Sequence, residues 1–464
     1  MPGLRNTSPW QAYSAARLTH GIRAPNGDTT MPSGQRRTAV IIGGGFGGLR
    51  AAKRLANTDV NVILIDRNNH HLFQPLLYQV ATAALSPGDI AQPLRSILRQ
   101  SSNVHVMMST VLHIDVDARR VVCDDGIVAY DHLILAPGAR HSYFGNDSWE
   151  RFAPGLKDLN DALRIRERLL TTFEEAESVI GTQLMKSLLT FVIVGAGPTG
   201  VELAGAIAEI ADRTMLADFP KLRRSDVRVL LVQASGRILE SFAEPLSRSA
   251  QRSLEALGVD VRLDTSVTDV TADGVRLGSE FIASRNVIWA AGNSASPLLA
   301  DLGTPLDAAG RAIVEPDCSI PGYPDVFVIG DAARFNHTTD GTPLPAVAQP
   351  AMQMGAYVAD LVRRNTEPTR RRPFRYRNLG SMATIGRARA IVDLGFFRSS
   401  GLFAWLMWAA LHVMQLISFR NRFKVMIEWA WYYLSFQPGA RLIINKDAPQ
   451  EIRRWVSLNS NDNS

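Results

Sequence analysis

Cysteine is nearly absent from this sequence of 464 residues, which contains only Cys123 and Cys318. The two lie far apart and neither belongs to a CxxC pair, so the sequence predicts no disulfide framework, no zinc site and no dithiol redox centre. We expect two inert buried thiols. No spacing of His, Asp or Glu indicates a metal site either, and no nucleophile with an adjacent base is recognisable.

A long hydrophobic run is missing from the first 37 residues, which excludes a secretory signal peptide. This segment holds five arginines against one acid, among scattered Ser, Pro and Gly. We expect residues 1–37 to form a disordered N-terminal extension, with a transit-type peptide as the alternative and Met31 as an alternative start.

Negative charge is in deficit, since the formal net charge is +6. Five of the eight tryptophans follow residue 400, and Arg420, Arg422 and Lys424 come directly after an apolar run. Basic residues beside aromatic residues are typical of a membrane interface. We therefore expect membrane lipid as a partner and no nucleic acid.

The apolar run at residues 401–419 carries no charge unless His412 is protonated. A helix of that length reaches about 28 Å, marginal for a hydrocarbon core of about 30 Å. Residues 425–436 add Trp429, Trp431, Tyr432 and Tyr433 around Glu428. Amphipathic helices lying in the headgroup region fit this pattern best, and a spanning helix near 401–419 or a buried core or dimer helix are the alternatives.

A glycine motif follows the β-branched run at residues 38–42 and leads into a helical pattern. It has the GxGxxG spacing at Gly43, Gly45 and Gly48, and Asp66 ends the next apolar run. In a strand-turn-helix unit these glycines allow a pyrophosphate to approach the helix N-terminus, and the acid binds ribose hydroxyls. The sequence therefore predicts a dinucleotide site here.

The same pattern returns at Gly195, Gly197 and Gly200, with Thr199 inside the loop, but the strand-end residue is Gln233. A neutral side chain does not repel a 2′-phosphate, so NADPH stays open beside NADH. Two dinucleotide sites in one chain suggest that one nucleotide is held and the other is exchanged. Three further apolar runs end in small residues and indicate strand ends that open onto ligand; they place Ala136, Gly292 and Asp331 there.

From about residue 38 to 440 the chain resembles the type II NADH dehydrogenases, single-subunit NADH:quinone oxidoreductases of respiratory membranes. The motifs that carry the resemblance are Gly43-Gly-Gly-Phe-Gly-Gly-Leu, His71-Leu-Phe-Gln-Pro-Leu-Leu-Tyr-Gln-Val-Ala, Gly195-Ala-Gly-Pro-Thr-Gly-Val-Glu, Val328-Ile-Gly-Asp, Ala348-Gln-Pro-Ala-Met-Gln, Gly380-Ser-Met-Ala-Thr-Ile-Gly and Phe419-Arg-Asn-Arg. The first and third would match many flavoproteins, whereas the second and the last three are more specific.

The resemblance implies that the first glycine loop holds FAD and the second binds NADH. The cofactor-binding residues expected are Gly43, Gly45, Phe46, Gly47, Gly48, Asp66, Ala136, Asp331, Ala348, Gly195, Gly197, Thr199, Gly200, Gln233 and Gly292. By the same resemblance Asp331 accepts from the FAD ribitol; the alternative is an N-cap of the following helix.

The resemblance also implies the catalytic residues Glu202, Gln349 and Gln353. The glutamate follows the NADH loop, where burial would raise its pKa and suit it to order water, bind nicotinamide ribose or relay protons. The glutamines lie at the flavin and the quinone entrance, where an amide can donate to a quinone carbonyl that gains charge. The structural alternatives are a helix-face Glu and a helix-surface Gln, and Met354 departs from the glutamine common in the family.

The fold expected is α/β, with two Rossmann-like dinucleotide-binding domains and a C-terminal α-helical membrane-attachment region. We assign residues 38–155 and 295–375 to a discontinuous FAD-binding domain, 188–294 to the NAD(P)H-binding domain and 376–464 to the membrane-associating region.

The function expected is non-proton-pumping NADH:quinone oxidoreduction at the cytoplasmic face of the cell membrane, with menaquinone or ubiquinone as acceptor and a homodimer left open. A soluble ferredoxin- or rubredoxin-type NAD(P)H reductase and a membrane-docked NADH-sensing flavoprotein are the alternatives. The missing cysteine pairs disfavour disulfide reductases and sulfide:quinone reductases.

Overall fold

The computed structural model describes residues 36–338, 341–417, 419–435 and 440–443. The predicted N-terminal extension therefore lies outside the described residues apart from its last two. The chain divides into two compact units. The first comprises the described residues up to His71 with Pro93–Ala139 and Ala295–Tyr376, and the second comprises Leu72–Gln92, Arg140–Ser294 and the described residues from Arg377 onward.

The first unit is built on a six-stranded sheet in the order β20-β21-β9-β1-β2-β5. All neighbours are parallel except β20 and β21. Strands β6, β7 and β8 form a separate antiparallel sheet. The bounds are β1 Thr38–Ile42, α2 Phe46–Leu55, β2 Asn61–Asp66, α5 Leu94–Ile97, β5 Val104–Met108, β6 Val111–Asp115, β7 Arg120–Cys123, β8 Gly126–Ala129, β9 His132–Leu135, β19 Ala312–Ile313, β20 Ser319–Ile320, β21 Tyr323–Val328, β22 Ala333–Arg334 and α11 Ala348–Arg364.

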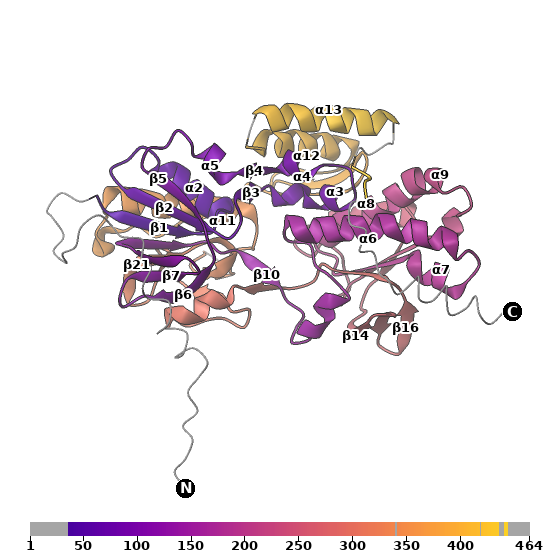
Figure 1. Cartoon of the computed structure of the whole chain (residues 1–464), viewed down its shortest axis with the longest axis horizontal. Coiled ribbons are helices and arrows are strands. Elements are labelled where there is room, and N and C mark those ends of the chain that lie inside the picture. Colours follow the sequence, from indigo (N-terminus) through magenta and orange to yellow (C-terminus); the bar gives the residue numbers. More distant parts are fainter. Residues whose placement is uncertain (1–35, 339–340, 418, 436–439, 444–464) are drawn as a thin grey trace, which may run out of the picture. The chain divides into compact units, whose positions relative to one another are not determined.

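Helices α2 and α11 lie beside this sheet (Figure 1). They approach so closely that a Cβ on Gly355 of α11 would come within 2.3 Å of the Gly47 carbonyl oxygen, and only glycine fits there. Strand β1 is almost fully buried, as its run of β-branched residues predicts. The parallel sheet with a glycine turn and helix after its central strand is the dinucleotide-binding arrangement.

The second unit repeats this pattern with a four-stranded parallel sheet in the order β13-β12-β11-β17. Strands β14 to β16, which lie between β13 and β17 in the sequence, form a separate antiparallel sheet. The bounds are α3 Leu77–Ala81, α4 Pro87–Ile90, α6 Leu159–Ser178, α7 Gln183–Leu188, β11 Thr190–Val194, α8 Pro198–Ile210, α9 Leu216–Asp218, β12 Arg228–Val232, α10 Glu244–Ala256, β13 Val259–Arg262, β14 Val267–Thr271, β15 Gly274–Leu277, β16 Glu280–Ala283 and β17 Asn286–Trp289. The chain passes from one unit to the other at four short strands, β3 His70–Leu72, β4 Ala91–Pro93, β10 Ala139–His141 and β18 Asn293–Ala295, and these form the two-stranded sheets β3-β4 and β10-β18.

The C-terminal part of the second unit contains a three-stranded antiparallel sheet ahead of its helices. Its strands are β23 Ser381–Gly386, β24 Arg389–Asp393 and β25 Arg398–Gly401, followed by α12 Leu402–Gln415 and α13 Phe419–Ser435. The predicted α/β class with two Rossmann-like sheets and C-terminal helices is confirmed. The sequence did not predict the sheet at residues 381–401, because the motif at residues 380–386 was interpreted only as a signature of the family.

Helices α12 and α13 lie side by side (Figure 1). No helix in the described part of the chain combines the length and apolar character needed to cross a membrane. The helix found near residues 401–419, where a spanning helix was the alternative, is α12, and it ends at Gln415. The large apolar side chains that α12 and α13 expose are Leu402, Phe403, Leu406, Leu411, Met414, Phe423, Met426, Ile427 and Trp431.

Helix α13 is fastened to the segment 72–92 by polar contacts. The Lys424 Nζ atom lies 2.6 Å from Oδ1 of Asp89, and the Trp429 indole N–H donates to Oε1 of Gln79 at 2.8 Å. Asn421 donates to the Asp89 carbonyl oxygen at 3.1 Å. Because the Asp89 side chain is only 2% exposed, its negative charge depends on the lysine for compensation.

We therefore expect Lys424→Met to lower the free energy of unfolding by about 1–3 kcal/mol, because it removes the cation from a buried carboxylate. Chemical denaturation of the detergent-solubilised protein measures this. Lys186→Met, at an exposed lysine of α7, is the control and should change stability by less than about 0.5 kcal/mol. Equal stabilities for the two variants would contradict the role given to this ion pair.

Candidate active site

The first glycine loop requires glycine at both of its ends. Gly43 has a φ of +99°, and a Cβ on it would lie 2.2 Å from the Ala136 carbonyl oxygen. A Cβ on Gly48 would lie 1.8 Å from the Gly43 carbonyl oxygen. Gly45 differs, because it is exposed and no atom lies within 4 Å of the position of its Cβ. The loop is thus closed toward the sheet and open toward solvent.

The open side of this loop is the N-terminus of α2, where Gly45 is the N-cap and no side chain caps the helix. Such an end presents backbone N–H groups and partial positive charge, which suits a pyrophosphate. Phe46 and Gly47 begin the first turn of α2. The residues present therefore fit a dinucleotide phosphate.

Asp66 ends β2 beside this loop. One of its carboxylate oxygens accepts from the Gly44 N–H at 2.6 Å and the other from the Asn68 N–H at 2.7 Å. An ionised carboxylate has about four acceptor positions, so two backbone bonds leave capacity for ribose hydroxyls. The position is the one predicted for a ribose-binding acid.

His71 supports the same loop and was not assigned a role from the sequence. Burial lowers the pKa of His71 to about 4, so the ring is neutral at pH 7. Its Nδ1 therefore carries the hydrogen that is donated to the Gly44 carbonyl oxygen at 2.9 Å. The ring also packs edge-on against Phe46, with the two ring centroids 5.2 Å apart. The unusual motif at residues 71–81 was the available signal, but it does not reveal this partner.

The other predicted residues of the first unit lie at strand and helix ends. Ala136 follows β9, and its N–H donates to the Ile42 carbonyl oxygen at 2.8 Å. Asp331 lies inside a single 3-10 turn, Gly330–Ala332, rather than at the N-cap of α11, which is Val347. The alternative role of Asp331 as a helix cap is therefore wrong.

Helix α11 begins at Ala348 and carries Gln349 and Gln353, both partly buried, one turn apart. The Tyr376 hydroxyl donates to Oε1 of Gln349 at 3.4 Å. Met354 is buried in the core. Side chains four residues apart share a helix face, so the two amides are presented together.

The second glycine loop repeats the first in the second unit. Gly195 has a φ of +100°, and a Cβ on Gly200 would lie 1.8 Å from the Gly195 carbonyl oxygen. Gly197 has open space around its Cβ position and is the N-cap of α8, which no side chain caps. Thr199 is exposed at this end of the helix. Gly292, also exposed, has a φ of +72°.

Gln233 takes the place that Asp66 has in the first unit. Its Oε1 accepts from the Ala196 N–H at 2.8 Å, and its Nε2 donates to the Ser235 hydroxyl at 2.6 Å. The side chain therefore holds the second residue of the loop as Asp66 does, but without charge.

Glu202 lies in the second turn of α8, on the side where β23 packs. The Thr384 N–H is 3.5 Å from its Oε1, and burial raises the pKa of Glu202 to about 8. At neutral pH the carboxyl group is therefore mostly protonated and can donate a hydrogen bond or a proton. A strongly shifted carboxyl group of this kind is a typical feature of an active site.

The comparisons with known proteins agree with this geometry. Residues 37–355 match the family described as pyridine nucleotide-disulphide oxidoreductase, and residues 378–435 match the NDH2 C-terminal domain. The chain is 42% identical to the type II NADH:quinone oxidoreductase Ndh of Mycobacterium tuberculosis, over 92% of this chain and 94% of the relative. It is 43% identical to NdhA of the same organism, over 88% and 89% of the two chains.

The chain belongs to the type II NADH:quinone oxidoreductase family. The predicted resemblance and enzyme class, an NADH dehydrogenase, are thereby confirmed. The fold is also that of NDH2 from Plasmodium falciparum in complex with NADH, with a TM-score of 0.81 at 19% identity, covering 88% of this chain and all of the other. A soluble reductase would have no reason to share the C-terminal domain of this family.

The titration of Glu202 should be visible in stability. Its folded pKa of about 8 lies above the ordinary value of 4.5, so the folded state favours the protonated form. The stability that this provides is complete below about pH 4.5 and is lost as the pH rises through about 8. Glu202→Gln mimics the protonated form, so the variant should gain stability over the parent between pH 5 and 8, and the gain should level off above pH 9.

Denaturation curves at pH 5, 7 and 9 measure this difference. Glu174→Gln, at an exposed glutamate of α6, is the matched control and should follow the parent at every pH. A stability gap that does not change with pH would show that Glu202 does not titrate in this range.

Proposed function

We propose that this protein transfers a hydride from NADH to FAD and passes two electrons to a membrane quinone without pumping protons. The observation that carries the proposal is the presence of two glycine loops in separate units, each with an open helix N-terminus that no side chain caps. One loop is beside an acid and the other beside an amide, which distinguishes two nucleotides. The loop at residues 43–48 binds FAD tightly, and the loop at 195–200 binds NADH.

FAD, when bound, accepts a hydride from NADH and returns two electrons to quinone. The protein binds and orients the partners of this reaction. The N-termini of α2 and α8 stabilise the two pyrophosphates, and Asp66 binds the FAD ribose. Ala136 and Gly292 provide side-chain-free edges, Asp331 accepts from the ribitol, and Ala348 lies at the start of the helix that carries the glutamines.

Glu202 holds a proton at neutral pH. In this position it binds the nicotinamide ribose or supplies a proton to the reduced quinone, in keeping with its place on the helix that begins at the NADH loop. Gln349 and Gln353 donate to the quinone carbonyls from α11, a fixed dipole where negative charge develops. Gln233 does not repel a 2′-phosphate, so this loop is compatible with NADPH as well as with NADH.

We propose the following domain assignment for these sites. Residues 38–155 and 295–375 form the FAD-binding domain, 188–294 the NAD(P)H-binding domain and 376–464 the membrane-associating region. The exposed apolar side chains of α12 and α13 support peripheral attachment to lipid. NADH supply places this attachment on the cytoplasmic face, with menaquinone or ubiquinone as acceptor, and a homodimer is compatible with it.

Matched substitutions in the two loops test which nucleotide each one holds. Gly45 and Gly197 both have extended backbones and open space at the Cβ position, so an added Cβ meets no other atom, and we expect the branched side chain of valine to block the approach of a phosphate. We expect Gly45→Val to yield folded, colourless protein. We expect Gly197→Val to yield yellow protein that NADH bleaches at least tenfold more slowly.

Absorption spectra of the purified variants and anaerobic stopped-flow bleaching distinguish these results. Thermal unfolding of both variants controls for misfolding. Loss of the flavin from the Gly197→Val variant alone would reverse the two assignments, and unchanged behaviour of both variants would remove them.

The quinone step is tested separately with Gln353→Leu. Loss of an amide donor at the acceptor should slow reoxidation of the reduced enzyme by a quinone analogue about tenfold to a hundredfold, and bleaching by NADH should be unchanged. Double-mixing stopped-flow measures both rates. Gln251→Leu on α10, in the other unit, is the control. Reoxidation at the parental rate in the Gln353→Leu protein would place the quinone elsewhere.

A further inference from the structure

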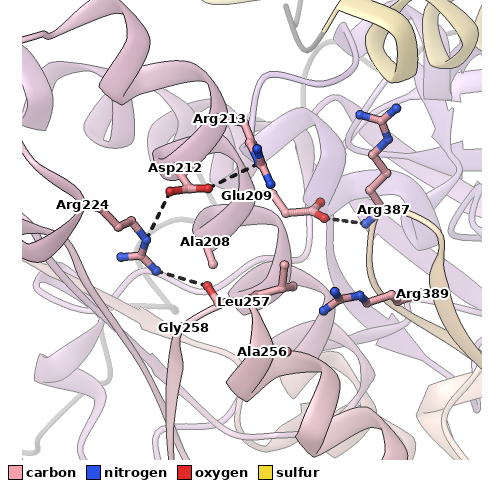
Figure 2. Close-up of a pocket in the computed structure, with 10 residues that line it drawn as sticks. All are labelled: Ala208, Glu209, Asp212, Arg213, Arg224, Ala256, Leu257, Gly258, Arg387 and Arg389. Carbon is pink, nitrogen blue, oxygen red and sulfur yellow. Dashed lines mark hydrogen bonds and ion pairs between the residues drawn. The ribbon is translucent and has the colours of Figure 1, made fainter.

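A cavity of about 460 Å³ lies in the second unit, outside every site described above. This volume is in the range of small-molecule sites. Four segments form it: the C-terminal end of α8 with the turn that follows it, the 3-10 turn Arg224–Asp226, the turn after α10 and the turn between β23 and β24 (Figure 2). The residues that line it are Ala208, Glu209, Asp212, Arg213, Arg224, Ala256, Leu257, Gly258, Arg387 and Arg389.

Positive charge predominates in this cavity, since four arginines face two carboxylates. Asp212 is shared, because Arg213 and Arg224 each approach it at 3.4 Å. Arg389, which is half-buried, donates to a neutral carbonyl oxygen, that of Ser253, at 3.1 Å. The carboxylates therefore balance only part of the charge.

The local backbone is unusual at the same place. Helix α8 continues into a π-helical turn, Ala211–Met215, which contains two of the lining residues. Such turns are rare and are frequent at functional sites. In addition, the Arg387 N–H donates to Oε1 of Glu209 at 2.7 Å, which holds the β23–β24 turn against α8 and keeps the cavity wall in place.

The arrangement of the arginines favours phosphate over a single carboxylate. They come from three segments and approach from different sides, with Arg224 opposite Arg387 and Arg389 (Figure 2). A tetrahedral phosphate offers oxygens in all of these directions, and the guanidinium fork donates two parallel bonds to a pair of them. Ala208, Ala256 and Leu257 give the cavity apolar surface between the charges.

We propose that this arginine cavity is a binding site for a phosphate-bearing small anion, distinct from both dinucleotide loops. Arg387 and Arg389 bind the phosphate oxygens from the hairpin side. Arg224 has a supporting role, because it donates to the Leu257 carbonyl oxygen at 3.1 Å and holds the turn after α10. The phosphate belongs either to a soluble molecule or to a lipid headgroup, since the chemistry recognised is the same.

The test uses the flavin-loaded, detergent-solubilised full chain and inorganic pyrophosphate as the probe. Calorimetry should show binding that weakens at least tenfold in the variant Arg387→Gln with Arg389→Gln, because each lost guanidinium removes charge-assisted bonds. The control removes the same charge from exposed positions of α10, Arg248→Gln with Arg252→Gln, and should bind within twofold of the parent. The variant Arg387→Lys with Arg389→Lys keeps the charge and should be intermediate.

Vesicle flotation distinguishes the two sources of phosphate. A lipid headgroup is identified if the parent does not bind pyrophosphate but prefers phosphatidic acid vesicles to phosphatidylcholine vesicles. This preference should be lost in the Arg387→Gln, Arg389→Gln protein and kept in the control. Absence of both effects, or equal losses in the α10 control, overturns the proposal and leaves the arginines as a brace between α8 and the hairpin. Flavin content and thermal unfolding check that each variant is folded, and the lysine variant replaces the glutamine variant if the latter is not.

Discussion

Two helix N-termini without side-chain caps are the feature on which the rest of this molecule depends. A glycine N-cap in place of Ser, Thr, Asp or Asn costs roughly a few tenths of a kcal/mol, and an additional glycine in ordered backbone costs about 0.5–1 kcal/mol. Both units accept these costs at the equivalent place, directly after the central strand of a parallel sheet. The cost is offset when an anionic pyrophosphate takes the place of the missing cap. The sheets, the close helix packing and the acid or amide beside each loop serve to hold these two ends open.

The glycine loops of the two units have the same backbone arrangement but differ in the charge of the side chain that holds them. Asp66 and Gln233 each accept a hydrogen bond from the second residue of a glycine loop, at 2.6 Å and 2.8 Å. The shared contact orients the loop, so it does not depend on the charge. The difference in charge is then free to select the nucleotide, because a carboxylate repels a 2′-phosphate and an amide does not. Two loops with the same backbone geometry but a different charge beside each can bind two different dinucleotides, one held permanently and one exchanged.

The sequence predicted what is local and missed what is distant. Both glycine loops, their strands and the helices after them follow from spacing within about 30 residues, which is the scale of a βαβ unit. The contacts of Asp89 with Lys424 and of Gln79 with Trp429 join residues 335 and 350 positions apart, so no local pattern indicates them. The strands at 381–401 escaped prediction for a related reason, since their short runs become a sheet only by packing against α8 and α12.

The pKa of Glu202 depends on the same packing, and the geometry explains how. Glu202 and Glu209 are seven residues apart on one face of α8, which is a rise of about 10.5 Å. They accept hydrogen bonds from the N–H groups of Thr384 and Arg387. These two donors are three residues apart along the hairpin, or about 10 Å, so the two spacings match. Between these contacts a Cβ on Gly205 would lie 2.0 Å from the Ile385 carbonyl oxygen, so the strand rests directly on the helix backbone. Helix and strand are therefore in register over two turns. Because this strand is what buries Glu202, the proton affinity of the carboxyl group is set by a hairpin whose far end forms the wall of the arginine cavity.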